Sequence, residues 1–256
     1  FVDRVMEPKS QVEIGLIGKY VELHDSYKSI TESMIHAGAR NEVKVNVRWI
    51  HSEALSVDNA GESLKGLDAV LVAPGFGSRG FEGKIEAVRI AREQGIPFLG
   101  ICFGMQAAVI EYSRNVLQLK GANSSEVEPD CAQPVIGLMS EQKQVTNMGG
   151  TMRLGACDCV LSEGSRAKEI YGKDSISERH RHRYEFNNAY LEDLASAGMQ
   201  ASGINPQTGL VEIIEVSDHP WFLAVQFHPE YQSTVVNPHP LFVAFVRAAK
   251  TYNTTK

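Results

Sequence analysis

Cys102 stands where a short apolar run gives way to an amphipathic stretch. The apolar run covers residues 96–101, the amphipathic stretch covers residues 105–117, and Gly100 and Gly104 lie two positions to either side of the cysteine. Small residues at these positions permit a sharp turn that leaves the central side chain exposed at the end of a strand. A helix that begins there supplies free N–H groups and a positive dipole, which favour a thiolate. The pattern therefore predicts a nucleophilic cysteine.

The same residues also fit a structural role, because free cysteine is among the most buried residue types. The other cysteines, Cys131, Cys157 and Cys159, are too few and too widely spaced for a disulfide framework, so reduced thiols are expected. Cys157 and Cys159 would share one face of a strand, and we interpret them as packing residues rather than metal ligands. The sequence predicts no metal site, and other residues must decide the role of Cys102.

A candidate relay follows the apolar run at residues 223–227, where His228, Pro229 and Glu230 are consecutive. Proline fixes its own φ near about −65°, so we expect Glu230 to reach the far ring nitrogen of His228. A thiol that attacks a carboxamide needs a base that takes its proton and later protonates the leaving amine, and a third group that holds the imidazole tautomer. Cys102, His228 and Glu230 supply all three.

A glycine-rich loop follows the apolar run at residues 68–73, and its backbone can approach a ligand closely. Attack on a carboxamide develops negative charge on the carbonyl oxygen, which must be met by preorganised donors. The backbone N–H groups of Gly75 and of Phe103, the residue after the nucleophile, are the predicted pair.

These groups need a scaffold that brings several strand ends together. In the first half of the chain apolar runs alternate with helical periodicity, which predicts an α/β domain with a doubly wound, mostly parallel sheet flanked by helices and with ligands at the carboxyl ends of its strands. The predicted strands cover residues 12–18, 43–49, 68–73 and 96–101, and the helices cover residues 27–39, 81–94 and 105–117. Residues 120–150 are predicted to form loops and short strands. In the second half strands are predicted at 149–159, 179–187, 211–216 and 223–227, and helices at 166–171, 190–197 and 241–249.

The composition favours one domain covering residues 1–256. The chain is 43% hydrophobic, carries a net charge of −6 and has no basic tract, so no nucleic-acid surface is expected. No run is long enough to span a membrane and the N-terminus lacks an apolar signal region, which indicates a soluble, cytoplasmic protein with no membrane partner. The first residue is not methionine, and we expect an upstream part to be missing.

Together these residues resemble the class I glutamine amidotransferase family, in which the nucleophile lies in a G-x-C-x-G turn and the other two residues lie in H-P-E. Within the family, the chain is most similar to the glutaminase domains of the CTP synthase branch. The segments that carry this match span almost the whole chain: G-K-Y-V-E-L-H-D (18–25), G-F-G-S-R-G (75–80), G-I-C-F-G-M-Q (100–106), S-R-N (113–115), M-R-L-G (152–155), E-R-H-R-H-R-Y-E-F-N (178–187) and N-P-H-P-L-F (237–242).

The resemblance implies a smaller antiparallel sheet and hydrolysis of L-glutamine to glutamate and ammonia through a γ-glutamyl thioester on Cys102. It implies delivery of the ammonia to an N-terminal synthase domain, absent from this chain, that aminates UTP with ATP and magnesium. Residues 1–11 would be the linker from that domain. GTP would be the activator, the full-length protein would form a homo-oligomer, expected to be a tetramer, and this domain would hold no cofactor.

The resemblance also assigns a glutamine site. Glu126 and Gln106 would contact the amino-acid head, Arg183 would pair with its carboxylate, and Phe76 and Tyr184 would line the pocket. The position of Gln106 on the first turn of the helix after Cys102 is independent support for its assignment.

One residue departs from the family pattern, in which the loop often reads G-G-F-G. Pro74 replaces the first glycine and has no N–H, so the predicted oxyanion donors are confined to Gly75 and Phe103. Arg79 and Arg153 are candidate contacts for GTP, and the alternative is that both are ordinary surface arginines.

Two other functions fit the same residues. A cysteine hydrolase of the same fold could act on another amide, such as a γ-glutamyl peptide. A regulatory or scaffolding domain without activity is the other alternative, and the presence of Cys102, His228 and Glu230 together disfavours it.

Overall fold

The computed structural model describes residues 1–138 and 152–256. Within these residues the main sheet has nine strands in the order β2-β1-β3-β4-β12-β11-β10-β7-β8, and a small sheet has the order β5-β6-β9. The main-sheet strands are β1 (Ser10–Gly18), β2 (Val43–His51), β3 (Ala69–Val72), β4 (Phe98–Ile101), β7 (Arg153–Leu161), β8 (Ser175–His182), β10 (Met199–Ile204), β11 (Val211–Val216) and β12 (Phe222–Val225). The small-sheet strands are β5 (Ala122–Ser124), β6 (Gln133–Gly137) and β9 (Glu185–Phe186).

The predicted α/β class is confirmed, and the main sheet has two halves of different connectivity. Strands β2, β1, β3, β4 and β12 pair in parallel, and helical crossovers join the first four of them in turn. From β12 onward the pairs with β11, β10, β7 and β8 are antiparallel. The antiparallel portion is thus larger than expected. The small sheet, expected to be antiparallel, is mixed, because β5 and β6 pair in parallel and β6 and β9 pair antiparallel.

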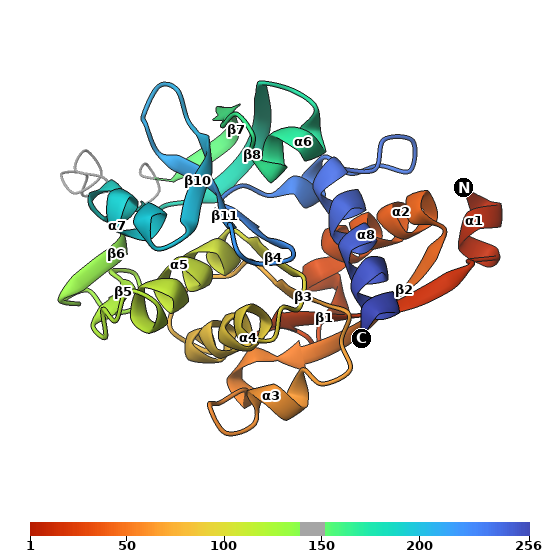
Figure 1. Ribbon diagram of the computed structural model, residues 1–256, viewed down its shortest axis with the longest axis horizontal. Helices are drawn as coiled ribbons and strands as arrows, with labels where there is room; N and C mark the ends of the chain where they lie inside the picture. Colours follow the sequence, from red (N-terminus) through yellow and green to blue (C-terminus); the bar gives the residue numbers. More distant parts are fainter. Residues whose placement is uncertain (139–151) are drawn as a thin grey trace.

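Helices cover both faces of the parallel half, as Figure 1 shows. Helices α4 and α5 cover one face and enclose a core with β3 and β4, whereas α2 and α8 cover the other face. This two-sided cover explains why β3 and β4 are buried along their whole length. The helices are α1 (Val2–Met6), α2 (Lys28–Asn41), α3 (Ala60–Ser63), α4 (Phe81–Glu93), α5 (Phe103–Asn115), α6 (Arg166–Tyr171), α7 (Leu191–Ser196) and α8 (Pro240–Thr255).

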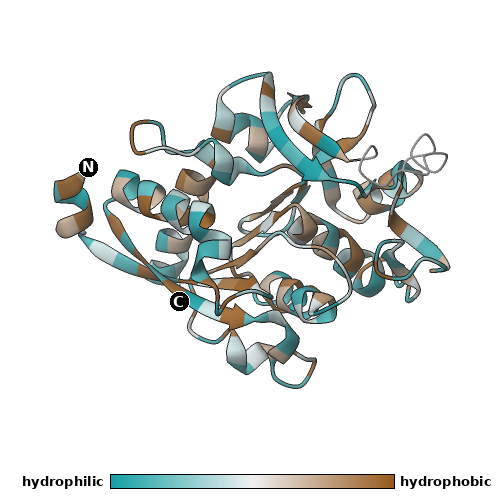
Figure 2. Cartoon of the chain, turned by 180° about the vertical axis from the view of Figure 1, so that it is seen from behind, coloured by the Kyte–Doolittle hydropathy of each residue, from teal (hydrophilic) through white to brown (hydrophobic). Residues whose placement is uncertain are grey.

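Strand β8 differs from the apolar strands of the sheet, and Figure 2 shows it as a hydrophilic band. Its burial alternates, so that Glu178, His180 and His182 point inward and the intervening arginines point outward. The chain bends at Arg183 and continues as β9 in the small sheet. The predicted single strand at 179–187 is therefore wrong, because one segment serves two sheets.

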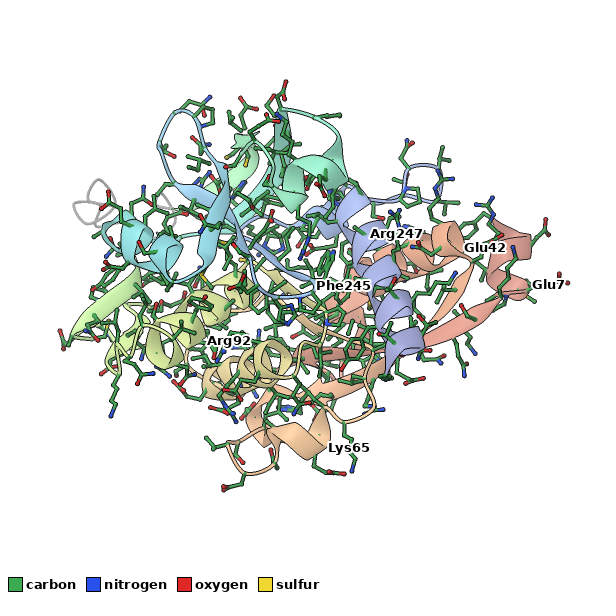
Figure 3. All side chains as sticks on the ribbon, viewed as in Figure 1. Glu7, Glu42, Lys65, Arg92, Phe245 and Arg247 are labelled. Atoms are coloured by element: carbon green, nitrogen blue, oxygen red, sulfur yellow. The ribbon has the colours of Figure 1, made fainter. Side chains whose placement is uncertain are left out.

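The side chains of the helices follow the layering of the sheet and its helical cover. On α8, Phe245 is fully buried against the sheet and Arg247, two positions later, is exposed, which is the amphipathic pattern of a helix that covers a core (Figure 3). Between α4 and α5, the Arg92 guanidinium donates to both carboxylate oxygens of the fully buried Glu111, at 2.7 and 2.9 Å. The two helices on this face are therefore joined by a bidentate ion pair as well as by packing.

Other expectations differ from the structure in smaller ways. Strand β10 was not predicted, since its sequence M-Q-A-S-G-I lacks a regular apolar alternation. The start of the strand predicted at 149–159 lies outside the described residues, and β7 begins at Arg153. Within the expected linker 1–11, residues Val2–Met6 form α1 and β1 begins at Ser10. No helix in the described ranges is long and apolar enough to cross a membrane.

Candidate active site

The carboxyl ends of three neighbouring parallel strands carry the predicted reactive groups. Strand β4 lies between β3 and β12, with Gly100 paired to Val72 on one side and to Ala224 on the other. The chain leaves the ends of β3, β4 and β12 into the glycine loop, Cys102 and His228, respectively. A cavity of about 490 Å³ opens there. Its lining includes nine of the ten predicted site residues: Gly75, Phe76, Cys102, Phe103, Gln106, Glu126, Arg183, Tyr184 and His228.

Cys102 forms the turn between β4 and α5 in a backbone conformation that is uncommon for a residue with a side chain. Its φ is 53° and its ψ is −104°, and its N–H donates to the Val225 carbonyl at 2.7 Å. The two flanking glycines are required by close packing. A Cβ on Gly104 would lie 2.2 Å from the Val72 carbonyl oxygen, and one on Gly100 would lie 2.9 Å from the Ala224 Cβ. The sharp turn predicted at Cys102 is therefore present, but the expected exposure of the side chain is wrong, because Cys102 is only 4% exposed.

Glu230, the tenth predicted residue, holds the ring of His228. The His228 Nδ1 lies 2.8 Å from the Glu230 Oε1, both side chains are buried, and the His228 ring stacks on Tyr231 with a centroid distance of 5.2 Å. Burial lowers the pKa of His228, but the negative charges of a Cys102 thiolate and of Glu230 outweigh it and raise the pKa to about 11. The Nε2 atom makes no regular hydrogen bond within the described residues, a common finding before substrate tightens such contacts.

Gln226 is a site residue that sequence reasoning missed. It is fully buried, its Nε2 lies 3.7 Å from the Cys102 Sγ, and its Oε1 accepts from the Gln106 Nε2 at 3.4 Å. A polar residue inside the apolar run 223–227 was the available signal. Gln226 links the sulfur to the side chain expected to contact the substrate.

The two predicted oxyanion donors have no competing acceptor. Within the described part of the chain, neither the Gly75 N–H nor the Phe103 N–H donates to a protein group. The loop that carries Gly75 is held by residues of other segments. The Gly77 N–H donates to the Glu126 Oε1 at 2.7 Å, and the Lys19 ammonium donates to the Phe76 carbonyl. Both Gly75 and Phe103 border the cavity that contains Cys102.

The residues expected to bind glutamine occupy different parts of the cavity. Gln106 is 2% exposed and its Nε2 donates to the Tyr184 carbonyl at 3.1 Å, which ties α5 to the bend after β8. Burial raises the pKa of Glu126, while the Gly77 N–H and the charges of Lys19 and Arg183 oppose that rise. Phe76 is 65% exposed and forms part of the rim. Acidic and basic groups therefore face one cavity, as an amino-acid head group requires.

Arg153, considered above as a GTP contact, has its guanidinium directed into the protein. It donates to Glu212 at 2.7 Å and to Glu185 at 3.3 Å, and both carboxylates are buried. Burial raises the pKa of Glu185 to about 8, although the Arg153 charge opposes the shift. These contacts do not fit a role for Arg153 as a nucleotide contact. Arg79 is half exposed and pairs with Glu53 at 2.6 Å.

Further lining residues come from segments whose roles were not predicted. They lie on the segment after β1, directly before β7, on β8, and after Glu230. These residues are Tyr20, Ser26, Tyr27, Met152, Arg181, His182 and Tyr231. The segment 18–25 was noted for its family match, but its spacing alone gave no sign that this part of the chain lines the same cavity as Cys102.

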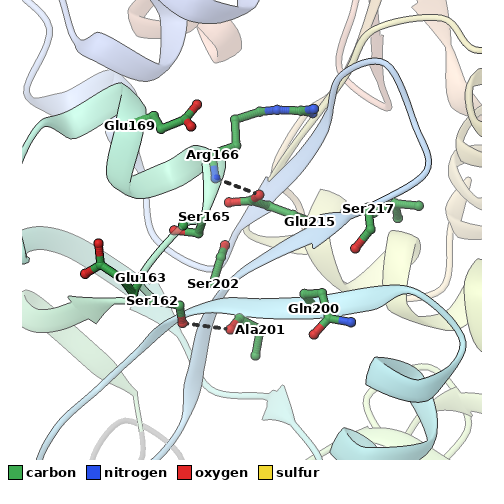
Figure 4. Close-up of a pocket in the computed structure, with 12 residues that line it drawn as sticks. Ser162, Glu163, Ser165, Arg166, Glu169, Gln200, Ala201, Ser202, Glu215 and Ser217 are labelled. Carbon is green, nitrogen blue, oxygen red and sulfur yellow. Dashed lines mark hydrogen bonds between the residues drawn. The ribbon is translucent and has the colours of Figure 1, made fainter.

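A second cavity, of about 510 Å³, lies between α6 and strands β10 and β11 (Figure 4). Glu215 accepts the Arg166 N–H at 3.1 Å, and Ser162 donates to the Ala201 carbonyl at 3.1 Å. None of the residues that line it is a cysteine or a histidine, so it offers no nucleophile and base. Across the described ranges, no group of three His, Cys, Asp or Glu side chains is arranged to hold a metal ion.

Comparison with known proteins agrees with this geometry. The family model "Glutamine amidotransferase class-I" matches residues 22–248. A CTP synthase of Christiangramia forsetii is 66% identical over 249 residues, which cover 97% of this chain and 46% of that protein. A CTP synthase of Flavobacterium psychrophilum is 65% identical with the same coverage. The chain thus spans about half the length of the curated relatives it matches.

Solved structures show the same relationship. The glutaminase domain of Trypanosoma brucei CTPS, solved with bound acivicin, is 39% identical with a TM-score of 0.89, and the match covers 94% of each chain. A putative GMP synthase protein from Thermoplasma acidophilum, 16% identical with a TM-score of 0.61, shares the fold, and the match covers 95% of this chain and 96% of that one. The chain belongs to the class I glutamine amidotransferase family and, within it, to the glutaminase domains of CTP synthases.

Proposed function

We propose that this chain hydrolyses L-glutamine to glutamate and ammonia, with Cys102 as the nucleophile. The observation that carries the proposal is the arrangement at three adjacent strand ends. There Cys102, His228 held by Glu230, and the N–H groups of Gly75 and Phe103, which have no acceptor among the described residues, meet at one cavity. This arrangement contains a nucleophile, a proton carrier with its orienting carboxylate, and donors for an oxyanion.

In the first step the Cys102 sulfur attacks the side-chain carbonyl carbon of glutamine. The charges of Cys102 and Glu230 raise the pKa of His228, so the imidazole carries the proton when the sulfur attacks. The carbonyl oxygen becomes negative and accepts hydrogen bonds from the N–H groups of Gly75 and Phe103. Collapse of this intermediate breaks the carbon–nitrogen bond, and the leaving nitrogen takes the proton of His228 and departs as ammonia.

In the second step water replaces the sulfur. Neutral His228, held through Nδ1 by Glu230, takes a proton from a water molecule that attacks the γ-glutamyl thioester. The carbon–sulfur bond breaks, glutamate is released, and the proton on His228 restores the starting pair. In both steps Glu230 fixes the ring of His228 and stabilises the imidazolium.

Charge complementarity supports an amino-acid substrate. Glu126 and Arg183 line the same cavity, and they would pair with the α-ammonium and the α-carboxylate of glutamine. Gln106 and Tyr184 are joined by a hydrogen bond and would also contact the head group, with Phe76 at the rim. A neutral amide, or a peptide without these charges, would offer no ammonium to Glu126 and no carboxylate to Arg183, and we therefore expect it to bind more weakly.

For the whole protein we propose the activity of its relatives. The ammonia would pass to an N-terminal synthase domain that uses ATP and magnesium to aminate UTP to CTP, and GTP would activate hydrolysis. Relatives about twice as long as this chain support a fused synthase domain, to which residues 1–11 would lead. A homotetramer and a cytoplasmic location for the full-length protein remain predictions from the family resemblance.

Glutamine hydrolysis by two cysteine variants tests the proposal. Cys102→Ala should abolish release of glutamate and ammonia, whereas the matched control Cys131→Ala, outside the cavity, should keep the native rate. The same assay with a γ-glutamyl peptide separates the alternative amide hydrolase. Faster release from the peptide than from glutamine would overturn the substrate assignment, and activity in Cys102→Ala would overturn the nucleophile.

A further inference from the structure

Lys84 is buried next to the proposed oxyanion loop, and the mechanism above gives it no role. It lies in the first turns of α4 and is only 1% exposed. Within the described residues no carboxylate forms an ion pair with it. Burial, with a smaller effect of the Lys19 charge, lowers its pKa to about 7, although the charge of Cys102 opposes the shift. A buried lysine without a carboxylate partner is costly for the fold, so its contacts need an explanation.

The ammonium of Lys84 binds the backbone at the start of the loop. Its Nζ donates to the Ala73 carbonyl at 2.5 Å and to the Pro74 carbonyl at 3.3 Å. It also lies 5.2 Å from the centre of the Phe103 ring. A Cβ built on Gly75 would stand 3.3 Å from the Nζ, so the loop rests directly on this side chain. Lys84 therefore contacts the loop that carries the Gly75 N–H and the side chain of Phe103, the residue of the second proposed oxyanion donor.

The Pro74 contact fixes the direction of the Gly75 N–H. The Pro74 carbonyl and the Gly75 N–H belong to one peptide group, and no peptide bond in the described chain is cis. In a planar trans peptide the C=O and the N–H point in opposite directions. When Lys84 holds the oxygen on the α4 side of the loop, the hydrogen points away from Lys84, and Gly75 borders the cavity that contains Cys102.

The peptide between Phe76 and Gly77 shows the alternative arrangement. The Phe76 carbonyl accepts from Lys19 and the Gly77 N–H donates to Glu126, so both ends of that peptide bind protein groups. In the peptide between Pro74 and Gly75 only the oxygen is bound, within the described residues, and the N–H stays available. Of these two peptides, the one at the oxyanion site is therefore held by its oxygen alone.

We propose that Lys84 is a positioning residue for the oxyanion hole, which it orients through the carbonyls of Ala73 and Pro74 and through the ring of Phe103. The inference rests on the proposed function, because it concerns the same reaction. Lys84 does not touch the substrate. It holds two backbone N–H groups in the geometry that stabilises the negative oxygen of the intermediate. The fold loses stability by burying this lysine, and the gain is a preorganised oxyanion hole.

Replacement of Lys84 by methionine tests this role. Methionine is unbranched and of similar length, but it cannot bind the two carbonyls. We expect kcat for glutamine hydrolysis to fall by about 10- to 100-fold, approaching the loss of about 10²- to 10³-fold that removal of one oxyanion donor causes, with KM within about threefold of native. Lys84→Arg retains the donors and should keep more activity than Lys84→Met. Arg89→Met, on the same helix but paired with Glu86 and Glu93, is the matched control and should behave as native.

Two chemical probes distinguish positioning of the oxyanion hole from general damage to the site. Iodoacetamide alkylates the Cys102 sulfur by displacement of iodide and creates no oxyanion. The Lys84 charge acts on Cys102, so the quantity to compare is the plateau rate of alkylation at high pH, which should be unchanged in Lys84→Met. A glutamine analogue with an aldehyde in place of the amide forms a hemithioacetal whose oxygen occupies the hole, so its affinity should fall by about the same factor as kcat.

Other results would overturn the inference. Native kcat in Lys84→Met would do so, and so would an equal loss of hydrolysis and of alkylation, because that pattern indicates a distorted Cys102. If Lys84→Met does not fold, Lys84→Gln carries the same prediction, since its shorter side chain cannot reach both carbonyls. Failure of the proposed function itself would appear separately, as hydrolysis that persists in Cys102→Ala.

Discussion

Replacement of Gly104 by alanine should move the nucleophile with a single methyl group. Gly104 is the second residue of α5 and packs against the backbone of β3. The new Cβ would lie 2.2 Å from the Val72 carbonyl oxygen, whereas ordinary van der Waals contact begins near 3.4 Å, so the two elements must separate by about 1.2 Å. The obstacle is a strand backbone rather than a flexible side chain, so the start of α5 must move and carry Cys102 and Phe103 with it.

Two opposing terms set the change in the free energy of unfolding. Alanine is a better helix former than glycine by about 1 kcal/mol, while overpacking costs about 1–3 kcal/mol and more where the backbone has to shift. The expected net result is a loss of about 1–2 kcal/mol. The effect on activity is larger, because a displacement of about 1 Å of reacting groups costs about 10²-fold in rate.

Denaturant unfolding and the kcat for glutamine hydrolysis measure the two effects in parallel. Gly61→Ala is the matched control, since Gly61 is also helical and a Cβ there meets only Ile90 at 3.8 Å. It should be neutral or stabilising by about 0.4–1 kcal/mol, with native activity. Native activity and stability in Gly104→Ala would refute the reasoning that close approach of α5 to β3 sets the position of Cys102.

Three further predictions concern the charges around the site and the expected synthase domain. Glu230→Gln removes one of the charges that raise the pKa of His228 to about 11, so the alkaline limb of kcat/KM should move to lower pH, and NMR titration of the ring should show the same shift; an unmoved limb would contradict this role. Lys84 has a pKa lowered to about 7 from 10.5, so between these values the unfolded chain binds more protons and native stability rises with pH. The stability of Lys84→Met relative to native should therefore be most favourable below pH 7 and decline toward pH 10, and unfolding curves that differ equally at all pH values would exclude the assigned cause. This chain without a synthase domain should be a poor glutaminase, and steady-state hydrolysis should increase when that domain and GTP are supplied; full activity alone would disprove it.

The parallel half of the fold was predictable because its signals are local. The apolar runs at β1, β3 and β4 and the helical periodicity of α2, α4 and α5 are contiguous in sequence, and the alternation of strand and helix determines a parallel sheet. Cys102 and His228 could be assigned to strand ends because each directly follows an apolar run, whereas the pairing of β4 with β12 came from the structure. The reactive residues of the site were thus predictable, because a cysteine or a histidine directly after a strand indicates its chemical role by its residue type and position.

The remaining features depend on tertiary contacts that leave weak local traces. Strand β10 takes its form from pairing with β11 and not from its own sequence. Arg153 resembled a surface arginine until its two buried carboxylates, distant in sequence, were known. Lys84 and Gln226 did leave a signal, since each interrupts an otherwise apolar, buried face. A polar residue in such a position must have a partner, but the sequence does not tell which backbone group or sulfur that partner is.

Mass spectrometry of the chain after reaction with an electrophilic glutamine analogue tests most directly whether Cys102 is the nucleophile. We expect one adduct, on Cys102, which excess glutamine suppresses and which Cys102→Ala abolishes. Cys159 is buried with a pKa raised to about 12, and Cys131 and Cys157 lie outside the cavity, so none of them should react at a comparable rate. An adduct on Cys131, Cys157 or Cys159 with Cys102 unmodified would contradict the assignment of the nucleophile.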